Sequence, residues 1–411
     1  MSHLNKQKRV NAVFQALIKV SGWASSFLVL LIVLFLFTEG LSLFTEAPVS
    51  GGLKVAVHPS NPVRELSPEE FRGLLDGDID NWSAIENGPD AEVFALSTGN
   101  LEKILKKQGV VKKRAEEAIG ENFVRLPNVL DSIMQAKPGI MLVFQPRFFP
   151  DNAQQVEVGD ISIGEFVAGP DWEPAESPAP IFGALPLLWG TVLVTIGAII
   201  LALLLGPPVA IYMAELADER TRGILKPVIE LLAGIPSVVY GFIGLVVIVP
   251  WIRETFALDS GSTALAGSIL LAIIALPTII SVSEDAIRAV PRDQKMASLA
   301  LGATHWQTIS RVVIPHAKSG ILAAIILGVG RIVGETMVVL MVTGNSPQLA
   351  GFDFLESVRT MSAAIAAEMG EAPQGGLHYK ALFAVGCLLF LMTFAINFVG
   401  EVIKERQKVK V

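Results

Sequence analysis

Six apolar runs dominate this sequence, and each is long enough to cross the hydrocarbon core of a bilayer as a helix, which needs about 20 residues. The runs are 20–37, 185–213, 228–251, 263–282, 320–342 and 379–399. A chain in lipid has to satisfy its backbone polar groups internally, and a continuous helix does this within each segment. The runs therefore predict an α-helical integral membrane protein with six transmembrane helices.

Composition agrees with a membrane setting: 52% of the residues are hydrophobic, 17% are charged, and the mean hydropathy is +0.55. The net charge of −7 belongs mainly to the segment between the first two runs, so it gives no argument for a nucleic-acid partner. The single cysteine, Cys387, excludes a disulfide within the chain and a zinc site built on cysteines. The spacing of the five histidines predicts no metal site.

Basic residues predict the orientation of the spans. They gather in the amino-terminal tail, at 220–226, at 288–318 and in the carboxy-terminal tail, which six spans place on one side. We therefore expect both termini in the cytoplasm. The first run is longer than a typical signal core and lacks a small-residue cleavage site, so we expect a retained anchor.

Residues 45–182, between the first and second runs, have the composition of a soluble protein. Local patterns predict strands at 55–57, 91–96 and 139–144 and helices at 68–75, with Ser67 as the cap, and 101–108. The alternation favours a small extracytoplasmic α/β insert. We expect three parts: a tail with the first helix (1–44), the insert (45–182), and a five-helix core (183–411) with a cytoplasmic loop at 284–318.

Residues 296–315 lie between the fourth and fifth runs and predict two short helices around Gly302, the second carrying Trp306, Ile309 and Val313 before Pro315 interrupts it. This pattern resembles the EAA loop of ABC importer membrane subunits, whose short helix fits a cleft in the ATPase subunit. The family's usual Glu falls on Met296 here. The alternative is an ordinary connector. The docking residues implied by the resemblance are Ala297, Ser298, Ala300, Gly302, Ala303, Trp306 and Pro315.

Arg331 and Glu335 lie about halfway along the fifth run, four residues apart, which predicts one shared helix face. A charge at mid-bilayer costs about 2.5–3.5 kcal/mol even on insertion scales, so such residues are candidates for function. Residues 330–337 closely resemble the signature of phosphate permease subunits of the PstC/PstA family, most like PstC. The resemblance implies a substrate path in which Arg331 meets the phosphate oxyanion and Glu335 holds the guanidinium, next to Thr336. The alternative is that Arg331 and Glu335 only neutralise each other's charge inside the helical bundle.

Residues 233–241 resemble the same family. Pro236 removes one helical hydrogen bond and precedes Ser237, so this segment is predicted either to line the path or gate it, or to be a packed kink.

Short sequence motifs within residues 61–82 of the insert resemble one lobe of phosphate-binding proteins. The place of that lobe's anion loop holds Ser97, Thr98, Gly99 and Asn100, where backbone N–H groups at a helix start could hold an anion. The alternative is a lobe that now serves docking or spacing.

The sequence contains no Gly-Lys dipeptide and hence no Walker A phosphate loop. The family resemblance implies a bacterial inner-membrane transport subunit, not an enzyme, of a phosphate importer. It also implies a dimer of ATPase subunits holding ATP and Mg, a second permease subunit and an extracytoplasmic phosphate-binding protein as partners. Loop 288–315 would couple the chain to the ATPase. Two other functions stay open: a permease for another oxyanion, and a regulatory membrane protein with a ligand-sensing insert.

Overall fold

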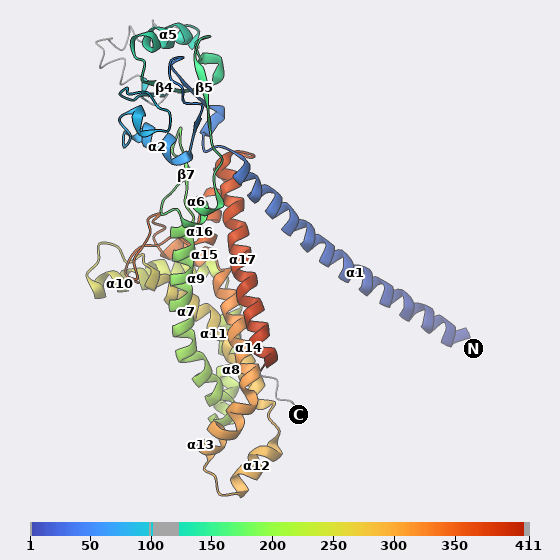
Figure 1. Cartoon of the computed structure of the whole chain (residues 1–411). Coiled ribbons are helices and arrows are strands. Elements are labelled where there is room, and N and C mark those ends of the chain that lie inside the picture. Colours follow the sequence, from blue (N-terminus) through green and yellow to red (C-terminus); the bar gives the residue numbers. More distant parts are fainter. Residues whose placement is uncertain (1, 98–99, 102–122, 407–411) are drawn as a thin grey trace.

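The computed structural model describes residues 2–97, 100–101 and 123–406. Figure 1 shows a long helical bundle, an α/β unit at one end of it, and helix α1 (Ser2–Leu41), which leaves the bundle at an angle. Helices α12 (Arg292–Ala300) and α13 (His305–Thr308) lie at the end of the bundle opposite the α/β unit (Figure 1). The molecule therefore carries two exposed modules, one at each end of the bundle.

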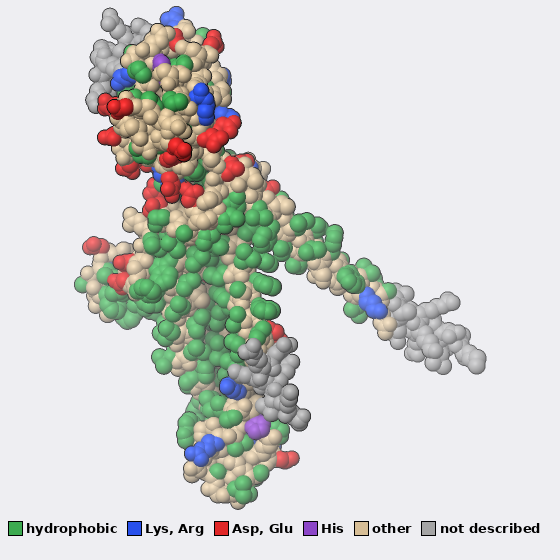
Figure 2. All heavy atoms as spheres, viewed as in Figure 1, with side chains coloured by type: hydrophobic (Ala, Val, Ile, Leu, Met, Phe, Trp, Pro, Cys, Tyr) green, Lys and Arg blue, Asp and Glu red, His purple; other side chains and the backbone are tan. Residues whose placement is uncertain are grey.

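Six helical segments in the described part of the chain are long and apolar enough to span a membrane. They are Phe14–Thr45, Leu185–Leu216, Ser237–Phe256, Ala264–Arg288, His305–Val333 and Leu377–Ile403. Figure 2 shows hydrophobic side chains covering the bundle, with acidic side chains gathered at the base of the α/β unit. The predicted α-helical membrane architecture with six spans is confirmed, although the third and fifth predicted spans are each interrupted.

The core of the bundle is helix α11 (Ala264–Arg288), which packs between α7 (Leu185–Ile211) and α14 (Ile314–Val333). Small residues bring these helices close together: a Cβ on Gly197 of α7 would lie 2.4 Å from Ser268 Oγ. Tight contact between backbones is the usual way in which helices associate in lipid. α17 (Leu377–Arg406) packs on the outside of α14.

Helix α1 contacts the bundle near its C-terminal end, where it meets α17. Phe35 packs edge-on against Phe383 at 5.5 Å between ring centroids, and Phe37 packs likewise on Phe390 at 5.9 Å. Further towards the N-terminus the side chains turn outwards, and Trp23 is 79% exposed. An apolar helix with this pattern is compatible with a lipid surrounding.

The third predicted span, 228–251, is wrong as a single helix. α8 (Glu219–Ala233) ends before Gly234, and α9 (Ser237–Ile243) restarts after Pro236 and continues through a π-turn, η7 (Gly244–Ile248), into α10 (Val249–Phe256). Pro236 has no N–H to donate, and it disfavours the helical conformation in the residue before it. The chain therefore leaves the helix at this point.

The fifth predicted span, 320–342, is also wrong as a single helix. It starts earlier, because α13 continues through a π-turn, η8 (Ile309–Val313), into α14, and it stops at Val333 before α15 (Met337–Val342). Pro315 does not interrupt the helix as expected. It occupies the first turn of α14, directly after the π-turn. At this position the N–H that proline lacks is not needed for a regular helical hydrogen bond.

The α/β unit contains a five-stranded sheet in the order β2-β5-β1-β4-β3. Strand β1 is antiparallel to β4 and β5, whereas β3 runs parallel to β4 and β2 parallel to β5. The strands are β1 (Lys54–Val57), β2 (Glu65–Leu66), β3 (Phe94–Ser97), β4 (Ile140–Phe144) and β5 (Gln154–Val158); the helices are α2 (Pro68–Asp76) and α5 (Leu126–Ala136). Short 3₁₀ turns are η1 (Ser42–Thr45), η2 (Ser50–Gly52), η3 (Trp82–Ala84) and η5 (Pro146–Phe148).

Both faces of this sheet are buried. Met141 and Val143 of β4 pack in one cluster with Phe71 of α2, while Leu142 and Phe144 pack in the other with residues of α5 such as Leu130. Successive side chains of a strand point to opposite faces, so one strand serves two cores. Ser67 caps α2 as expected, with its side chain accepting from the Glu70 N–H at 3.2 Å. The expected helix 101–108 lies outside the described residues except for Leu101.

A strap of residues 159–184 connects the sheet to α7. It contains α6 (Ile163–Ala168), β6 (Trp172–Glu173) and β7 (Ile181–Phe182). Phe166, Trp172 and Phe182 are buried in one cluster with residues of α16 (Met361–Glu368) and α17. The strap therefore packs against the bundle and connects the sheet to it.

Candidate translocation site and docking face

The fifth span is interrupted at Gly334, Glu335 and Thr336. The Glu335 N–H donates to Ile332 O at 3.2 Å, and the Ser362 hydroxyl of α16 donates to Glu335 O at 3.1 Å. The next residues of α15, Val338 and Val339, are buried again. Non-helical backbone within a membrane is tolerated where protein groups or a wet cavity satisfy it, and these two hydrogen bonds supply protein partners here.

Arg331 and Glu335 do not share one helix face, so this prediction is wrong. Arg331 lies in the last turn of α14 and is exposed, whereas Glu335 lies in the interruption and is half-buried. Gly334 carries no side chain and ends the regular helix, so the four-residue spacing no longer brings the two charges together. In the described part of the chain no ion pair joins them. The structure therefore offers no support for mutual neutralisation.

The interruption at Gly234, Ile235 and Pro236 adjoins the same region. The Tyr240 hydroxyl of α9 donates to Leu232 O at 2.8 Å, which fastens α9 to the end of α8. α9 packs along α15, and a Cβ on Gly241 would lie 2.6 Å from Met341 Sδ. Arg331 lies near enough to Tyr240 for an electrostatic interaction.

The structure thus brings the predicted residues Pro236 and Ser237 into the same pair of interrupted spans as Glu335 and Thr336. Discontinuous helices that face one another at membrane depth are a common way for transporters to expose backbone and charged groups to a substrate. Among the described residues, Arg331 places a positive charge at this position and Glu335 a negative one, so the arrangement offers both a fork of N–H donors and a carboxylate.

A buried charge cluster that the sequence did not predict surrounds Glu284, near the end of α11. The Glu284 side chain is fully buried, with Arg222 Nη2 at 2.7 Å, Lys226 Nζ at 3.1 Å and Arg288 Nη1 at 3.7 Å. Two of these cations come from α8, so the cluster ties α8 to α11. Arg222 and Lys226 are four residues apart in the sequence, a spacing that places two cations on one helix face.

Lys226 has a raised pKa. Burial alone lowers the pKa of this amine, but the hydrogen bond and negative charge of Glu284 outweigh that effect. A raised pKa means that this contribution to stability is present at neutral pH and is lost only when the pH rises through the folded-state pKa, above the usual value of 10.5. Lys226 therefore keeps its positive charge over the physiological range.

The predicted docking face is an exposed helix pair. Gly302 ends α12 with φ of +88°, a left-handed conformation that favours glycine, and Thr304 caps α13 in a reciprocal arrangement with Gln307. Exposed apolar side chains lie on both helices and on the turn between them: Met296 is 64% exposed, Leu301 90% and Trp306 62%. Three large apolar side chains exposed on one short segment are compatible with a protein interface.

The predicted docking residues lie on this pair or in the turn between its two helices, with Pro315 as the exception. Ala297, Ala300, Gly302 and Trp306 are exposed, and Ser298 and Ala303 are partly exposed. Pro315 is exposed but belongs to the first turn of α14. Two contacts hold the pair in place: Ser298 Oγ lies 3.0 Å from Thr308 Oγ1, and Lys295 Nζ lies 2.5 Å from Glu215 Oε1 at the end of the second span.

The predicted anion loop of the insert is closed on itself where the structure describes it. The Ser97 N–H donates to Asn100 Oδ1 at 2.8 Å, and Asn100 Nδ2 donates to Ala95 O at 3.0 Å. Thr98 and Gly99 lie outside the described residues. The Ser97 N–H of the predicted loop thus already has an internal acceptor.

Comparison with known proteins places these features in a family. The family model of the binding-protein-dependent transport system inner membrane component matches residues 206–409. A probable ABC transporter permease, YqgH of Bacillus subtilis, is 40% identical over 256 residues, which cover 62% of this chain and 82% of the relative. The phosphate transport system permease PstC of Mesorhizobium japonicum is 36% identical over 250 residues, covering 56% of this chain and 75% of the relative.

The chain belongs to the PstC-like family of ABC transporter permeases. The PstC protein of Haemophilus influenzae is 33% identical over 249 residues, covering 56% of this chain and 77% of that protein. Among solved structures, an inward-facing MetNI methionine ABC transporter covers 54% of this chain and 94% of its own, with 20% identity and a TM-score of 0.43. As a PstC-like permease, the chain is a multi-pass inner-membrane transport subunit.

Proposed function

We propose that this chain is the permease subunit of an ATP-driven phosphate importer and forms half of its translocation path. The observation that carries the proposal is the pairing of two interrupted spans beside one exposed guanidinium, Arg331, in a chain whose relatives are named phosphate permeases. A guanidinium presents a planar fork of donors that matches phosphate geometry. The hydroxyls of Ser237 and Thr336 would add donors without charge.

In this mechanism Arg331 attracts the phosphate oxyanion into the path. Glu335, which is not paired with Arg331, places a negative charge further along the interruption and limits how long the anion stays. A transport site has to bind well enough to admit the substrate and weakly enough to release it. Pro236 and Gly334 allow the two spans to change their local packing while the rest of the bundle stays folded.

The partners follow from the same proposal. The exposed pair α12 and α13 would dock a dimer of ATPase subunits, which would bind ATP and Mg and carry out hydrolysis. A second permease subunit, most simply a distinct chain, would complete the path, and an extracytoplasmic phosphate-binding protein would deliver the anion. With the docking face in the cytoplasm, both termini are cytoplasmic and the α/β unit is extracytoplasmic.

Phosphate uptake by the reconstituted complex tests the proposal. We expect Arg331→Gln to lower uptake by about tenfold or more, because a charge-assisted contact contributes roughly 1.5–3 kcal/mol. Arg331→Lys, which keeps the charge and loses the fork, is expected to retain part of the uptake. Arg253→Gln, a matched change at an exposed arginine of α10 outside loop 288–315, controls for the loss of a positive charge alone. Co-purification of the partner subunits verifies assembly.

A permease for a different oxyanion is the second candidate, because a guanidinium also suits sulfate. Competition separates the two: arsenate, the tetrahedral analogue of phosphate, is expected to inhibit uptake and sulfate is not. Equal inhibition by both anions would contradict the phosphate assignment. A complex that hydrolyses ATP without moving any anion would contradict transport and favour the regulatory function.

A further inference from the structure

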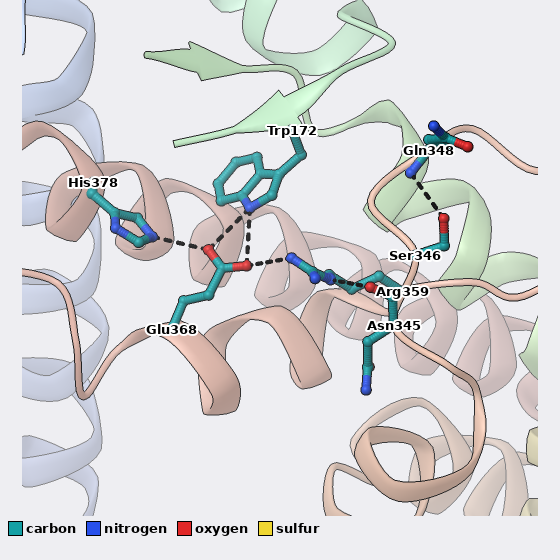
Figure 3. Close-up of polar contacts among 7 residues, drawn as sticks. All are labelled: Trp172, Asn345, Ser346, Gln348, Arg359, Glu368 and His378. Atoms are coloured by element: carbon teal, nitrogen blue, oxygen red, sulfur yellow. Dashed lines mark hydrogen bonds and ion pairs between the residues drawn. The ribbon is translucent and has the colours of Figure 1, made fainter. Parts of the chain in front are cut away.

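Glu368 gathers three hydrogen-bond donors from three separate parts of the chain. Trp172 Nε1 of the strap donates to Glu368 Oε2 at 3.0 Å, Arg359 Nη1 lies 2.5 Å from Oε1, and His378 Nε2 of α17 lies 2.9 Å from Oε2 (Figure 3). Arg359 is fixed in turn, since its Nε donates to Asn345 O at 2.9 Å. One carboxylate thus joins the strap, the loop before α16, and α17.

This joint is well shielded from water. The Glu368 side chain is 15% exposed, those of Arg359 and His378 are 20% and 18% exposed, and Trp172 is 1% exposed. Charge-assisted hydrogen bonds are the stronger kind, and a carboxylate that loses one of its donors in such a place is left poorly solvated. The joint therefore holds the strap, and with it the base of the α/β unit, in one position.

The opposite end of α16 touches the interrupted span. The Ser362 hydroxyl donates to Glu335 O at 3.1 Å, and the Met361 N–H donates to Thr191 Oγ1 of α7 at 2.9 Å. Ser362 and Glu368 lie six residues apart on this helix, a distance of about 9 Å. One short helix therefore has the strap at one end and the backbone of the candidate site at the other.

The first half of α16 is packed. Met361, Ala363 and Ala364 are fully buried, whereas Ala366 and Ala367 are exposed, and the helix contacts α7, α15 and α17. A helix of two turns is stiff, because its backbone hydrogen bonds join each residue to the preceding turn. We therefore expect a displacement at Glu368 to reach Ser362.

We propose that α16 is a strut that couples the strap beneath the α/β unit to the conformation of the interruption at Glu335. Glu368 and Ser362 are its two positioning residues, and Trp172 is the contact through which the strap acts on it. The inference rests on the proposed function for its consequence, namely that the position of the strap sets the shape of the path. The coupling itself is a property of this chain and is measured without phosphate.

Backbone hydrogen exchange of the full-length chain in lipid nanodiscs tests the strut. Trp172→Phe removes one N–H donor and keeps the aromatic packing. We expect exchange in 333–340 to become at least about threefold faster, since loss of the joint lets α16 and its contact with Glu335 fluctuate. Trp82→Phe is the matched control: Trp82 is fully buried and donates to Gly139 O at 2.8 Å within the sheet unit, so its loss should leave 333–340 unchanged.

Reciprocity gives a second readout, because coupling between two sites acts equally in both directions. Ser362→Ala should speed exchange in the strap, at 171–184, and Glu368→Gln should speed exchange at both ends. Unchanged protection of 333–340 in both Trp172→Phe and Glu368→Gln would overturn the strut. Failure of the proposed function is distinguishable, because it appears as absence of phosphate uptake by the wild-type complex and leaves the exchange pattern intact.

Discussion

At the scale of single residues, charges explain most of what the sequence could and could not predict. Arg331 and Glu335 were found because ionisable residues in an apolar run are rare. Their positions relative to each other could not be predicted, because a four-residue spacing places two side chains on one face only while the helix continues. Glu284 was missed because it lies at the end of an apolar run, where a charge is ordinary. Its partners in α8 are brought to it only by tertiary packing.

The Glu284 cluster gives a prediction for stability. Glu284→Ala leaves two cations of α8 without their shared carboxylate, and we expect a loss of about 2 kcal/mol or more, moderated by the access of Arg222 and Lys226 to water. Asp285→Asn is the matched control, since Asp285 is 70% exposed and its pair with Lys226 contributes little. Thermal unfolding of the purified chain measures both changes. Equal melting temperatures for the two variants would contradict the assigned role.

At the scale of elements, hydropathy predicted the six spans and missed two of their interruptions. An average over a window of residues records how apolar a segment is and does not record whether its hydrogen bonds are continuous. Pro236 gave a local signal in the third span, and the structure ends a helix there. Gly334 gave a weaker signal, because glycine is frequent in membrane helices that do not break. The helix pair α12 and α13 was easier to predict from the sequence, because Gly302 and the Thr304 cap are local features.

Gly302 gives a prediction at this scale. Its φ of +88° disfavours any residue with a Cβ, so Gly302→Ala should cost about 1–2 kcal/mol and distort the turn between α12 and α13. We expect affinity for the ATPase subunit to fall by about fivefold or more. Gly223→Ala in α8, where φ is not left-handed and a Cβ meets open space, should have no such effect. A binding titration with the purified ATPase that gives equal affinity for Gly302→Ala and wild type would refute this.

At the scale of the whole molecule, two adjacent chain segments connect the α/β unit to the bundle. The Ile161 N–H donates to Glu46 O at 3.3 Å, so the chain enters and leaves the unit at one place. The sequence predicted an insert from its composition. It could not predict that the strap packs with the bundle, because that depends on contacts between Trp172 and residues almost 200 positions later.

A replacement experiment follows from this attachment. Exchanging residues 48–159 for a short Gly-Ser linker should leave the bundle folded, because the two cores of the sheet unit are separate from those of the bundle. Extending the exchange through 182 should destabilise it strongly, since Phe166, Trp172 and Phe182 are lost from a bundle cluster. Yield and monodispersity in mild detergent measure both. Equal yields would argue against the strap as part of the bundle.

Helix α1 has a consequence for biosynthesis. Its packing partner α17 is made last: Phe383 follows Phe35 by about 350 residues, or roughly 20–70 s of synthesis at 5–20 residues per second. During that interval α1 lies in the bilayer without its contacts to α17, while the intervening helices insert. A helix with this schedule has to be stable in lipid by itself, and its outward-facing Trp23 and Phe27 meet that requirement. Helix α1 is thus made long before the helix against which it packs.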